Sequence, residues 1–290
     1  MSILAVVVVV VVVGFGCFPL LSALWRVSLE GRAPPGLWRA AVGEVSAFVR
    51  IVGWSLGRHA PAVPEDVDID VDAEVVVVFV HGAMADGSCT TAWQEAVVAA
   101  GVGVPIFAPD HGAIVRSLTV HAQRTQAFVA RVRRRCPKAA LVFVGHSMGG
   151  LVIRKMLADD DGLRAATRGV VSVASPHRGT QSMRGIGRLF GAAHLGFQHP
   201  EISALPALEQ LVPGSVFIAS AVDAVVYPKA TSLPRRWGID DDAGLVFSFD
   251  ELGHAALLVR AEVAERIAVL VAAMVVSPRG PDPLPRTAPA

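Results

Sequence analysis

Short runs of apolar residues alternate with stretches of helical periodicity along most of the chain. The first run, Val75 to Val80, contains only β-branched and aromatic residues, which is typical of a strand buried on both faces of a parallel sheet. Because helical stretches separate most of these runs, the pattern predicts an α/β fold with a doubly wound, mostly parallel sheet. Further strands are predicted at Val104 to Ala108, Leu141 to Val144, Gly169 to Ala174, Ser215 to Ala221 and Leu245 to Phe249.

The N-terminal residues form one long apolar run instead. No charged side chain occurs from Ile3 to Trp25, and about 20 apolar residues in a helix suffice to cross the hydrocarbon layer of a membrane. The alternative, a cleaved signal peptide, usually starts with positive charge and has an apolar core of about 7 to 15 residues. The chain shows neither feature, so we expect residues 1–26 to form a single-pass transmembrane anchor. The arginines after this run favour the cytoplasmic side for the rest of the chain without settling it: Arg26, Arg32 and Arg39.

Residues 27–73 are expected to form an amphipathic helix and a linker. Between Gly36 and Gly57, small and basic residues recur every three or four positions, and apolar residues such as Trp38 take the other face. Such a helix can lie in a membrane interface or pack on the following domain, and the pattern favours neither. The domain that carries the predicted sheet spans residues 74–276, and the Pro-rich segment 277–290 is expected to be a disordered tail.

Composition excludes several classes of protein. Apolar residues make up 53% of the chain and charged residues 18%, which excludes a disordered protein. The 26 basic and 25 acidic residues give a net charge of +1, too small for a field that would hold nucleic acid, so no nucleic-acid partner is expected. Cys17, Cys89 and Cys136 have no metal-ligand spacing and cannot form a disulfide framework. Neither a metal nor a cofactor is expected.

Polar side chains follow nearly all of the predicted strands. In a doubly wound sheet, ligands bind beyond the carboxyl ends of the strands, so these residues are the candidates for chemistry. The segment Gly145-His146-Ser147-Met148-Gly149 follows the third strand and fits the G-x-S-x-G pattern of a nucleophile elbow. In such an elbow the flanking glycines leave room for a strained turn that holds the serine upright between strand and helix. Ser147 is therefore the predicted nucleophile.

A nucleophilic serine needs a general base and an acid that orients the base. The chain order in this kind of site is serine, then acid, then histidine, and His254 is the only histidine after Asp223. Asp223 directly follows the fifth predicted strand, which places its carboxylate at the same sheet edge as Ser147. We therefore favour Asp223 over its rivals, which are Asp240, Asp241, Asp242, Asp250 and Glu251.

Two backbone N–H groups, those of Ala83 and Met148, are predicted to hold an oxyanion, since such donors follow the first strand and the nucleophile. Apolar residues near these positions suit an acyl chain, namely Ala83, Met84, Met148, Leu257 and Leu258. Other histidines are expected to be structural or to lie at the surface, namely His81, His111, His121, His177 and His199.

Several segments together resemble the bacterial lipase and esterase branch of the α/β-hydrolases. They lie between about residues 74 and 275 and are Val80 to Gly82, Gly145 to Gly150, Ser175 to Thr180 and Gly253 to Leu258. The last is similar to the G-H-x-x-L-L segment of small, lidless bacterial lipases, and Asp223 to Pro228 is similar to their D-x-x-V-x-P acid loop. With its N-terminal apolar run, the layout also resembles membrane-tethered proteobacterial hydrolases.

The resemblance implies a serine esterase or lipase that hydrolyses acyl or lipid esters through an acyl-enzyme, without a cofactor. Ser147 would attack, His254 would carry the proton and Asp223 would orient His254. A thioesterase or acyltransferase would use the same triad. A catalytically silent membrane scaffold is a third alternative, against which the complete set of site positions argues. The segment from Gln181 to Val212 is longer than a lidless enzyme needs and is expected to form either a lid or a packed helix. The sequence motifs do not indicate an oligomeric state.

Overall fold

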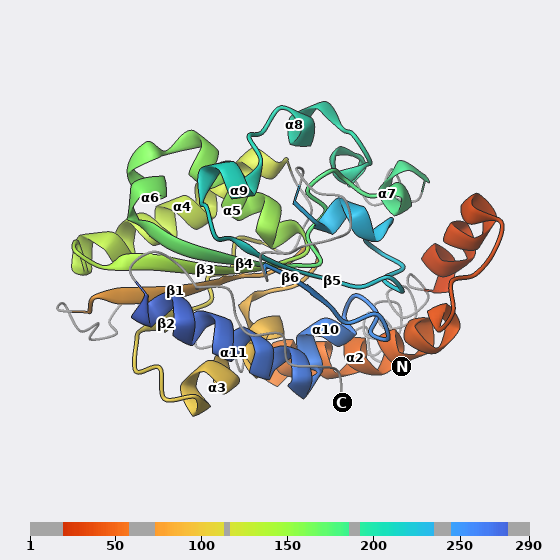
Figure 1. Ribbon diagram of the computed structural model, residues 1–290, viewed down its shortest axis with the longest axis horizontal. Coiled ribbons are helices and arrows are strands. Elements are labelled where there is room, and N and C mark those ends of the chain that lie inside the picture. Colours follow the sequence, from red (N-terminus) through yellow and green to blue (C-terminus); the bar gives the residue numbers. More distant parts are fainter. Residues whose placement is uncertain (1–19, 58–72, 113–116, 186–191, 235–244, 278–290) are drawn as a thin grey trace, which may run out of the picture.

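The computed structural model describes residues 20–57, 73–112, 117–185, 192–234 and 245–277. Its centre is a six-stranded parallel sheet with the strand order β2-β1-β3-β4-β5-β6 (Figure 1). The predicted doubly wound parallel sheet is confirmed, and every observed strand overlaps its predicted run. The strands are β1 (Val75–Val80), β2 (Ile106–Phe107), β3 (Ala140–His146), β4 (Thr167–Val173), β5 (Val216–Ala219) and β6 (Val246–Ser248).

The chain reverses its direction across the sheet after β2. Because β2 and β3 lie on opposite sides of β1, the carboxyl ends of β1 and β3 form a topological switch point, where sheets of this kind bind ligands. The register aligns these ends, since Val80 pairs with Gly145 and His146 pairs with Val173 of β4. β5 continues the edge, because Ile218 pairs with Val173. The residues that follow these strands therefore meet at one edge of the sheet.

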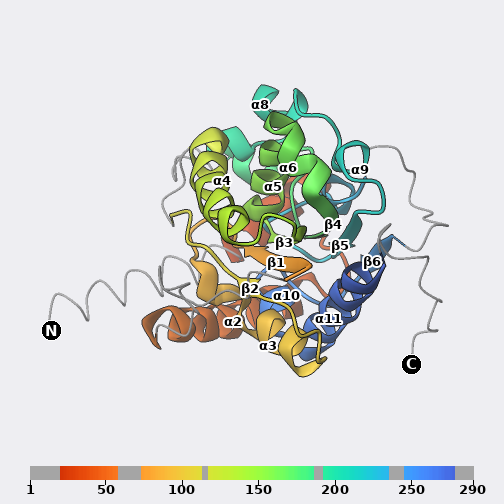
Figure 2. The same cartoon turned by 90° about the vertical axis from the view of Figure 1, so that its left-hand side faces the viewer.

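Alternate side chains of each strand enter two cores, one on each face of the sheet. The even-numbered residues of β1 pack with α4 (Leu118–Arg135) and α5 (Met148–Asp159), and the odd-numbered ones pack with α3 (Thr91–Ala99) and α11 (Ala261–Val276). Figures 1 and 2 show these two helical layers on opposite sides of the sheet. Burial of every β1 side chain explains why this run contains no polar residue.

The chain between β4 and β5 forms a cap on α5. Its hydrophobic side chains Leu195, Ile202, Leu205 and Leu208 are buried in the same core as α5. The described part of the segment from Gln181 to Val212 is thus packed on the domain, the second of the two predicted alternatives, while residues 186–191 lie outside the described residues. The short helices here are α7 (Gln181–Gly185), η3 (Ala193–Leu195), α8 (Pro200–Ser203) and α9 (Leu208–Leu211), and α6 (Asp161–Ala166) precedes β4.

The buried guanidinium of Arg154 ties this cap to α5. Its nitrogens donate to the carbonyl oxygens of Pro206 at 2.7 Å, Leu205 at 2.6 Å and Ile202 at 3.3 Å, and to that of His177 at 2.8 Å. Burying an arginine without partners costs several kcal/mol. The carbonyl groups of the cap are therefore what makes a charge tolerable at this position.

An N-terminal helix, α2 (Leu37–Gly57), packs on the sheet domain beside α10 (Ala256–Val259) (Figure 1). Packing was one of the two predicted alternatives, but the apolar face does not do the packing, because Trp38, Val42 and Val49 are 44%, 64% and 53% exposed. Alanines make up half of the face against the domain, where α2 closely approaches the backbone around α10. That face consists of Leu37, Ala40, Ala41, Glu44, Ala47 and Ile51.

The N-terminal anchor is tested only in part. Residues 20–30 are helical and lie at the edge of the molecule next to α2 (Figure 1), whereas residues 1–19 lie outside the described residues. Within the part of the chain that the structure describes, no helix has the length and hydropathy needed to cross a membrane. The anchor over residues 1–26 therefore stays a prediction, as does the tail 277–290, of which only Ser277 is described.

Replacing Arg154 by methionine should lower the free energy of unfolding by roughly 3 kcal/mol, because several buried carbonyl groups lose a charged donor. Urea unfolding followed by circular dichroism measures the change. Arg164→Met is the matched control, since Arg164 pairs with exposed Asp161 at 2.7 Å, and such a pair contributes less than about 1 kcal/mol. Equal losses for both variants would show that Arg154 does not hold the cap.

Candidate active site

Ser147 lies at the turn between β3 and α5 in an unusual backbone conformation. Its φ of 53° and ψ of −124° fall in a region that residues other than glycine rarely adopt. The Ser147 N–H donates to the carbonyl oxygen of Val173 at 2.8 Å, and the Ser147 carbonyl accepts from Gly150 N at 3.2 Å. Ser147 is partly exposed, whereas its neighbours His146 and Met148 are buried. The turn thus presents the predicted nucleophile at the edge of the sheet.

Close approaches explain two glycines around this turn. A Cβ atom at Gly149 would lie 2.1 Å from the carbonyl oxygen of Val80, so no other residue fits between α5 and β1. A Cβ atom at Gly82 would lie 3.0 Å from Ser147 Cβ and 3.2 Å from His146 Nδ1. Gly82 therefore allows the loop after β1 to lie directly against the nucleophile.

His254 and Asp223 are joined by a hydrogen bond. His254 Nδ1 donates to Asp223 Oδ2 at 2.7 Å, and Asp223 Oδ1 accepts the N–H groups of Val225 and Val226, each at 2.7 Å. Burial alone would lower the pKa of His254, but the charge and the hydrogen bond of Asp223 outweigh it, and that pKa lies above its usual value. The bond also fixes the tautomer, which leaves Nε2 of the neutral ring as the proton acceptor.

His146 connects this pair to the nucleophile. Its Nε2 lies 3.2 Å from the carbonyl oxygen of His254, and the two ring centroids are 4.7 Å apart. Burial holds the pKa of His146 well below its usual range, so the ring is neutral and donates this hydrogen bond. Because His146 directly precedes Ser147, its hydrogen bond to the His254 carbonyl group brings the backbone of His254 close to the turn at Ser147. The structure thus brings Ser147, Asp223 and His254 to one edge of the sheet.

The rival acids are engaged elsewhere, are exposed or lie outside the described residues. Asp250 forms an ion pair with Lys229 at 2.9 Å and accepts the N–H of Ala221 at 2.8 Å. Glu251 is exposed, and residues 240–242 fall outside the described ranges. Of the described candidates for the acid, Asp223 is therefore the one bonded to the imidazole of His254.

The two residues predicted to supply oxyanion donors, Met148 and Ala83, lie next to Ser147 in sequence or in space. Met148 is the first residue of α5, where N–H groups have no partner within the helix and the helix dipole favours negative charge. Ala83 follows Gly82, which lies against Ser147, and is partly exposed. Met148 adjoins Ser147 in sequence and Ala83 adjoins it through Gly82, and their role as oxyanion donors stays a prediction.

Buried histidines brace the loop after β1. His81 Nδ1 donates to the carbonyl oxygen of Gly82 at 2.8 Å, and its ring stacks on that of His111 with the centroids 3.7 Å apart. His111 also contacts His121, with 3.0 Å between their Nδ1 atoms. Burial lowers the pKa of His111 to about 3, so this ring is uncharged at neutral pH. The other two histidines that we expected to be structural are also bonded, His177 to Ser172 and His199 to Glu201.

The apolar residues expected around an acyl chain are only partly at the surface. Met84, with a φ of 61°, is exposed in the loop after β1. Met148, Leu257 and Leu258 instead fill the two cores, because α5 and α10 use them to pack on the sheet. The expectation that these three side chains line an acyl pocket is therefore wrong.

Two residues at this edge were not predicted from the sequence. Glu44 of α2 accepts the two backbone N–H groups that directly follow His254, at 2.8 and 2.9 Å. Arg26 of the helix 20–30 donates to the carbonyl oxygen of Asp223 at 3.1 Å. One feature of the sequence could have indicated a role for Glu44: it is the single acidic residue between positions 31 and 64, in a segment that otherwise carries only basic charges.

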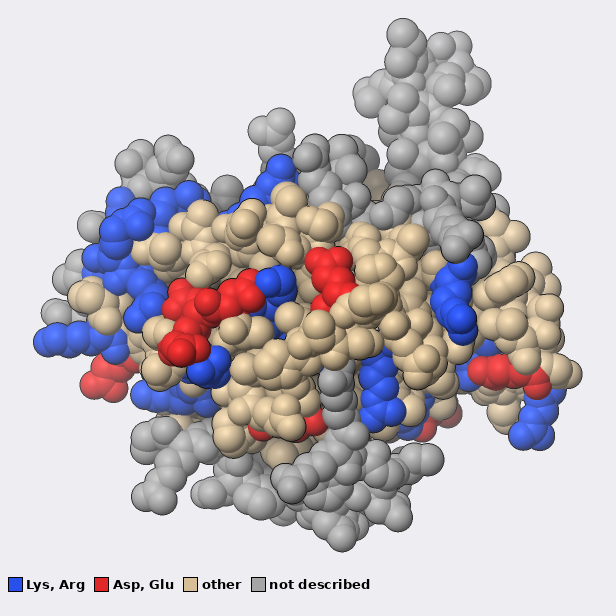
Figure 3. Space-filling model, turned by 90° about the horizontal axis from the view of Figure 1, so that it is seen from above, with Lys and Arg blue, Asp and Glu red and all other residues tan. Residues whose placement is uncertain are grey.

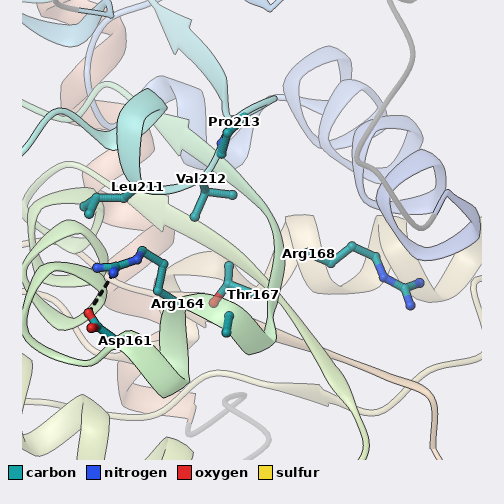
Figure 4. Close-up of a pocket in the computed structure, with 8 residues that line it drawn as sticks. Asp161, Arg164, Thr167, Arg168, Leu211, Val212 and Pro213 are labelled. Carbon is teal, nitrogen blue, oxygen red and sulfur yellow. Dashed lines mark ion pairs between the residues drawn. The ribbon is translucent and has the colours of Figure 1, made fainter.

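A separate pocket lies at the opposite end of the strands, where Thr167 begins β4 (Figure 4). In this pocket Arg164 pairs with Asp161 at 2.7 Å, while the side chain of Arg168 points away from them and donates to the carbonyl oxygen of Val275. Its polar groups are therefore engaged, and it does not adjoin Ser147. Among the described residues, no group of three or more His, Cys, Asp or Glu side chains is arranged to hold a metal ion.

Comparisons with known proteins agree with this architecture. The family model of the PGAP1-like alpha/beta domain matches residues 111–190, which include the turn at Ser147. Among solved structures, Aspergillus fumigatus lipase B is similar with a TM-score of 0.57 and 13% identity, over 75% of this chain and 56% of the lipase. This chain thus spans little more than half the length of that lipase. Among curated proteins, no sequence matches.

Two further solved structures are similar at comparable identity. One is a gene product from Listeria innocua, with a TM-score of 0.49 and 14% identity over 67% of this chain and 92% of that one. The other is a pyrethroid hydrolase from Sphingobium faniae JZ-2, with a TM-score of 0.45 and 16% identity over 70% and 98%. At such identities the likeness concerns the fold alone.

Replacing Asp223 by asparagine should lower the pKa of His254 below its usual value, because burial of the ring is then opposed only by the smaller effect of the Glu44 carboxylate. Titration of the His254 imidazole by NMR measures this pKa. Asp250→Asn is the matched control at the rival acid, which pairs with Lys229 instead. A larger effect of Asp250→Asn than of Asp223→Asn would contradict our assignment of the acid.

Proposed function

We propose that this chain, whose fold is that of the α/β-hydrolases, is a serine hydrolase that cleaves neutral carboxylic esters through an acyl-enzyme. The observation that supports the proposal is that His254, bonded to Asp223, contacts His146, the residue directly before Ser147 on its strained turn. A nucleophile, a base and an orienting acid in this order are the parts that acyl transfer requires. A silent scaffold has no need for all three.

In the first step, Ser147 Oγ attacks the ester carbonyl carbon while His254 Nε2 takes the hydroxyl proton. Asp223 stays ionised and stabilises the imidazolium, and the N–H groups of Ala83 and Met148 hold the oxyanion of the tetrahedral intermediate. Collapse of this intermediate breaks the bond to the alcohol, which leaves with the proton from His254. A water molecule then attacks the acyl-enzyme by the same route, which releases the carboxylic acid and restores Ser147.

The charges around the site favour an uncharged substrate. Asp223 and Glu44 place buried carboxyl groups next to His254, so a substrate carboxylate or phosphate would be repelled. The nearby cations Arg26 and Lys229 are engaged by carbonyl groups and by Asp250. On the helical face seen in Figure 3, basic and acidic side chains lie close together in the left half, and other residues cover most of the surface. A neutral acyl or lipid ester fits this distribution of charge.

The wild-type protein should react with a fluorophosphonate probe at Ser147 and hydrolyse nitrophenyl esters from acetate to decanoate, without added metal and unaffected by EDTA. Ser147→Ala and His254→Ala should each lower ester hydrolysis by roughly 10³-fold or more, because the residues act as a unit. Probe labelling on gels and absorbance assays measure these effects. Ser203→Ala, at an exposed serine of the cap, is the control and should label like the wild type.

A folded protein that is inert toward these neutral esters but cleaves a charged or peptide substrate would overturn the proposal. Thioesters of the same acyl groups should be included in the panel. A preference for them, or acyl transfer to an added alcohol in place of hydrolysis, would point to a thioesterase or an acyltransferase that uses the same triad.

We also propose that the N-terminal segment attaches the protein to a membrane. Large apolar side chains project from the helix 20–30 and from α2, and those at positions 21, 24 and 25 belong to the uncharged run that starts at Ile3. Exposed apolar surface of this kind marks a contact with a partner or a membrane, and the adjoining apolar run favours lipid. These side chains are Leu21, Leu24, Trp25, Leu29, Trp38, Val42 and Val49.

The full chain should stay in the membrane fraction after high-salt and carbonate washing and be released by detergent, because about 20 apolar residues are enough to span the hydrocarbon layer. Fractionation and N-terminal sequencing of the recovered protein check this. Recovery of a mature protein that begins after residue 25, or of a full-length chain in the aqueous fraction, would rule out the anchor.

A further inference from the structure

Residues 20–57 hold the two loops that carry the acid and the base of the site. Arg26 donates to the carbonyl oxygens of Ala221 at 2.8 Å and Asp223 at 3.1 Å. Ser22 Oγ donates to the carbonyl oxygen of Ala224. The loop of the acid is therefore fixed from the N-terminal side, by residues nearly 200 positions away in the sequence.

Glu44 holds the loop of the base in a similar way. The Glu44 residue is 2% exposed, and its Oε2 accepts the N–H of Ala255 at 2.8 Å while its Oε1 accepts that of Ala256 at 2.9 Å. These two amides directly follow His254 and lead into α10. On the other side of His254, a Cβ atom at Gly253 would lie 2.4 Å from Glu44 Oε1. The backbone from Gly253 to Ala256 thus wraps around the carboxylate.

A buried carboxylate at this place also acts on the charge of the site. Two titratable groups act on the charge of Glu44, namely His254 and Asp223. The short helix η1 (Gly87–Thr90) also packs on α2, and its Ser88 is uncharged, with its Oγ 3.2 Å from Ser55 Oγ. Burial raises the pKa of Glu44 to about 7, although the two amides and His254 oppose the rise. When Glu44 is ionised, its charge adds to that of Asp223 and favours protonation of the imidazole.

We propose that Glu44 is a positioning residue for His254. It fixes the turn that carries the imidazole by accepting both amides after it, and its negative charge stabilises the imidazolium that forms when Ser147 loses its proton. The kinetic consequence rests on the proposed hydrolase function, but the effect on the titration of His254 does not. The N-terminal segment is then part of the catalytic unit and not only a membrane attachment.

The test compares Glu44→Gln with the full wild-type protein in detergent. Glutamine keeps the size of the side chain but removes its charge and one of the two acceptors, so the pKa of His254 measured by NMR should fall. With nitrophenyl butyrate, kcat should fall about tenfold, the effect of losing a hydrogen bond to a charged group, while KM changes less than about twofold. The acid limb of the pH profile of kcat/KM should move to lower pH, because the neutral base persists to lower pH.

Matched variants separate positioning from general damage. Ser46→Ala lies on the same helix at an exposed position, where the hydroxyl bonds to Gly43, and should behave like the wild type. Glu44→Asp keeps the charge and should retain more of the raised His254 pKa than Glu44→Gln does. If Glu44→Gln does not fold, Gly253→Ala displaces the carboxylate from the other side, and the same lowering of the His254 pKa and of kcat is expected.

Two results would overturn the proposal. The first is an unchanged His254 pKa in Glu44→Gln, or in Gly253→Ala if only that variant folds. This result decides against the proposed role of Glu44 even if kcat falls, because a purely structural role would lower kcat without changing the pKa. The other is a lowered pKa with kcat unchanged in an active enzyme. A wild-type protein that is inert toward esters defeats the proposed function instead, and the titration then decides the role of Glu44 by itself.

Discussion

The strained turn at Ser147 is the constraint on which the rest of the site depends. A residue other than glycine with a φ of 53° costs about 1 to 3 kcal/mol and persists only where its surroundings enforce it. Here β3 enters the turn and α5 leaves it, and both are buried in the cores of the domain. Gly149 allows α5 to reach the carbonyl group of Val80, so a strand and a helix with fixed positions hold the turn from both ends. Two buried elements thus hold the proposed nucleophile.

The proposed acid and base lie on loops, which no strand or helix of their own holds in place. Side-chain hydrogen bonds hold these loops instead. His254 is held by Asp223 at its ring, by His146 at its carbonyl oxygen and by Glu44 at the amides that follow it. Each of these partners comes from a different part of the chain. The imidazole is therefore oriented by several independent contacts, which suits a group that must meet a fixed nucleophile within a few tenths of an ångström.

The sequence predicts those parts of the structure whose signal is local. The strands and the elbow at Ser147 are read from consecutive residues, and Asp223 and His254 from their place after a strand and their order in the chain. The side on which α2 packs was not predicted because half of its buried residues are alanines, which carry little hydrophobic signal but allow close approach. The role of Glu44 depends on pairing with residues 211 positions away, and no periodic pattern encodes such a contact. Leu257 and Leu258 were misplaced because the side on which α10 packs is likewise set by tertiary contacts.

The two faces of α2 allow one helix to serve the membrane and the site together. Glu44 and Ile51, seven residues apart, lie against the domain, and Val42 and Val49, also seven apart, are exposed. With 3.6 residues per turn, each pair spans two turns on its own side of the helix. A lipid contact on the outer face therefore does not compete with the bonds of Glu44 on the inner face. The burial of Glu44 against the turn after His254 in turn limits how far α2 can move away from the domain, because separation would leave two amides and a carboxylate without partners. The segment that we propose binds a membrane is thereby kept on the sheet domain by Glu44, the residue that we propose orients His254.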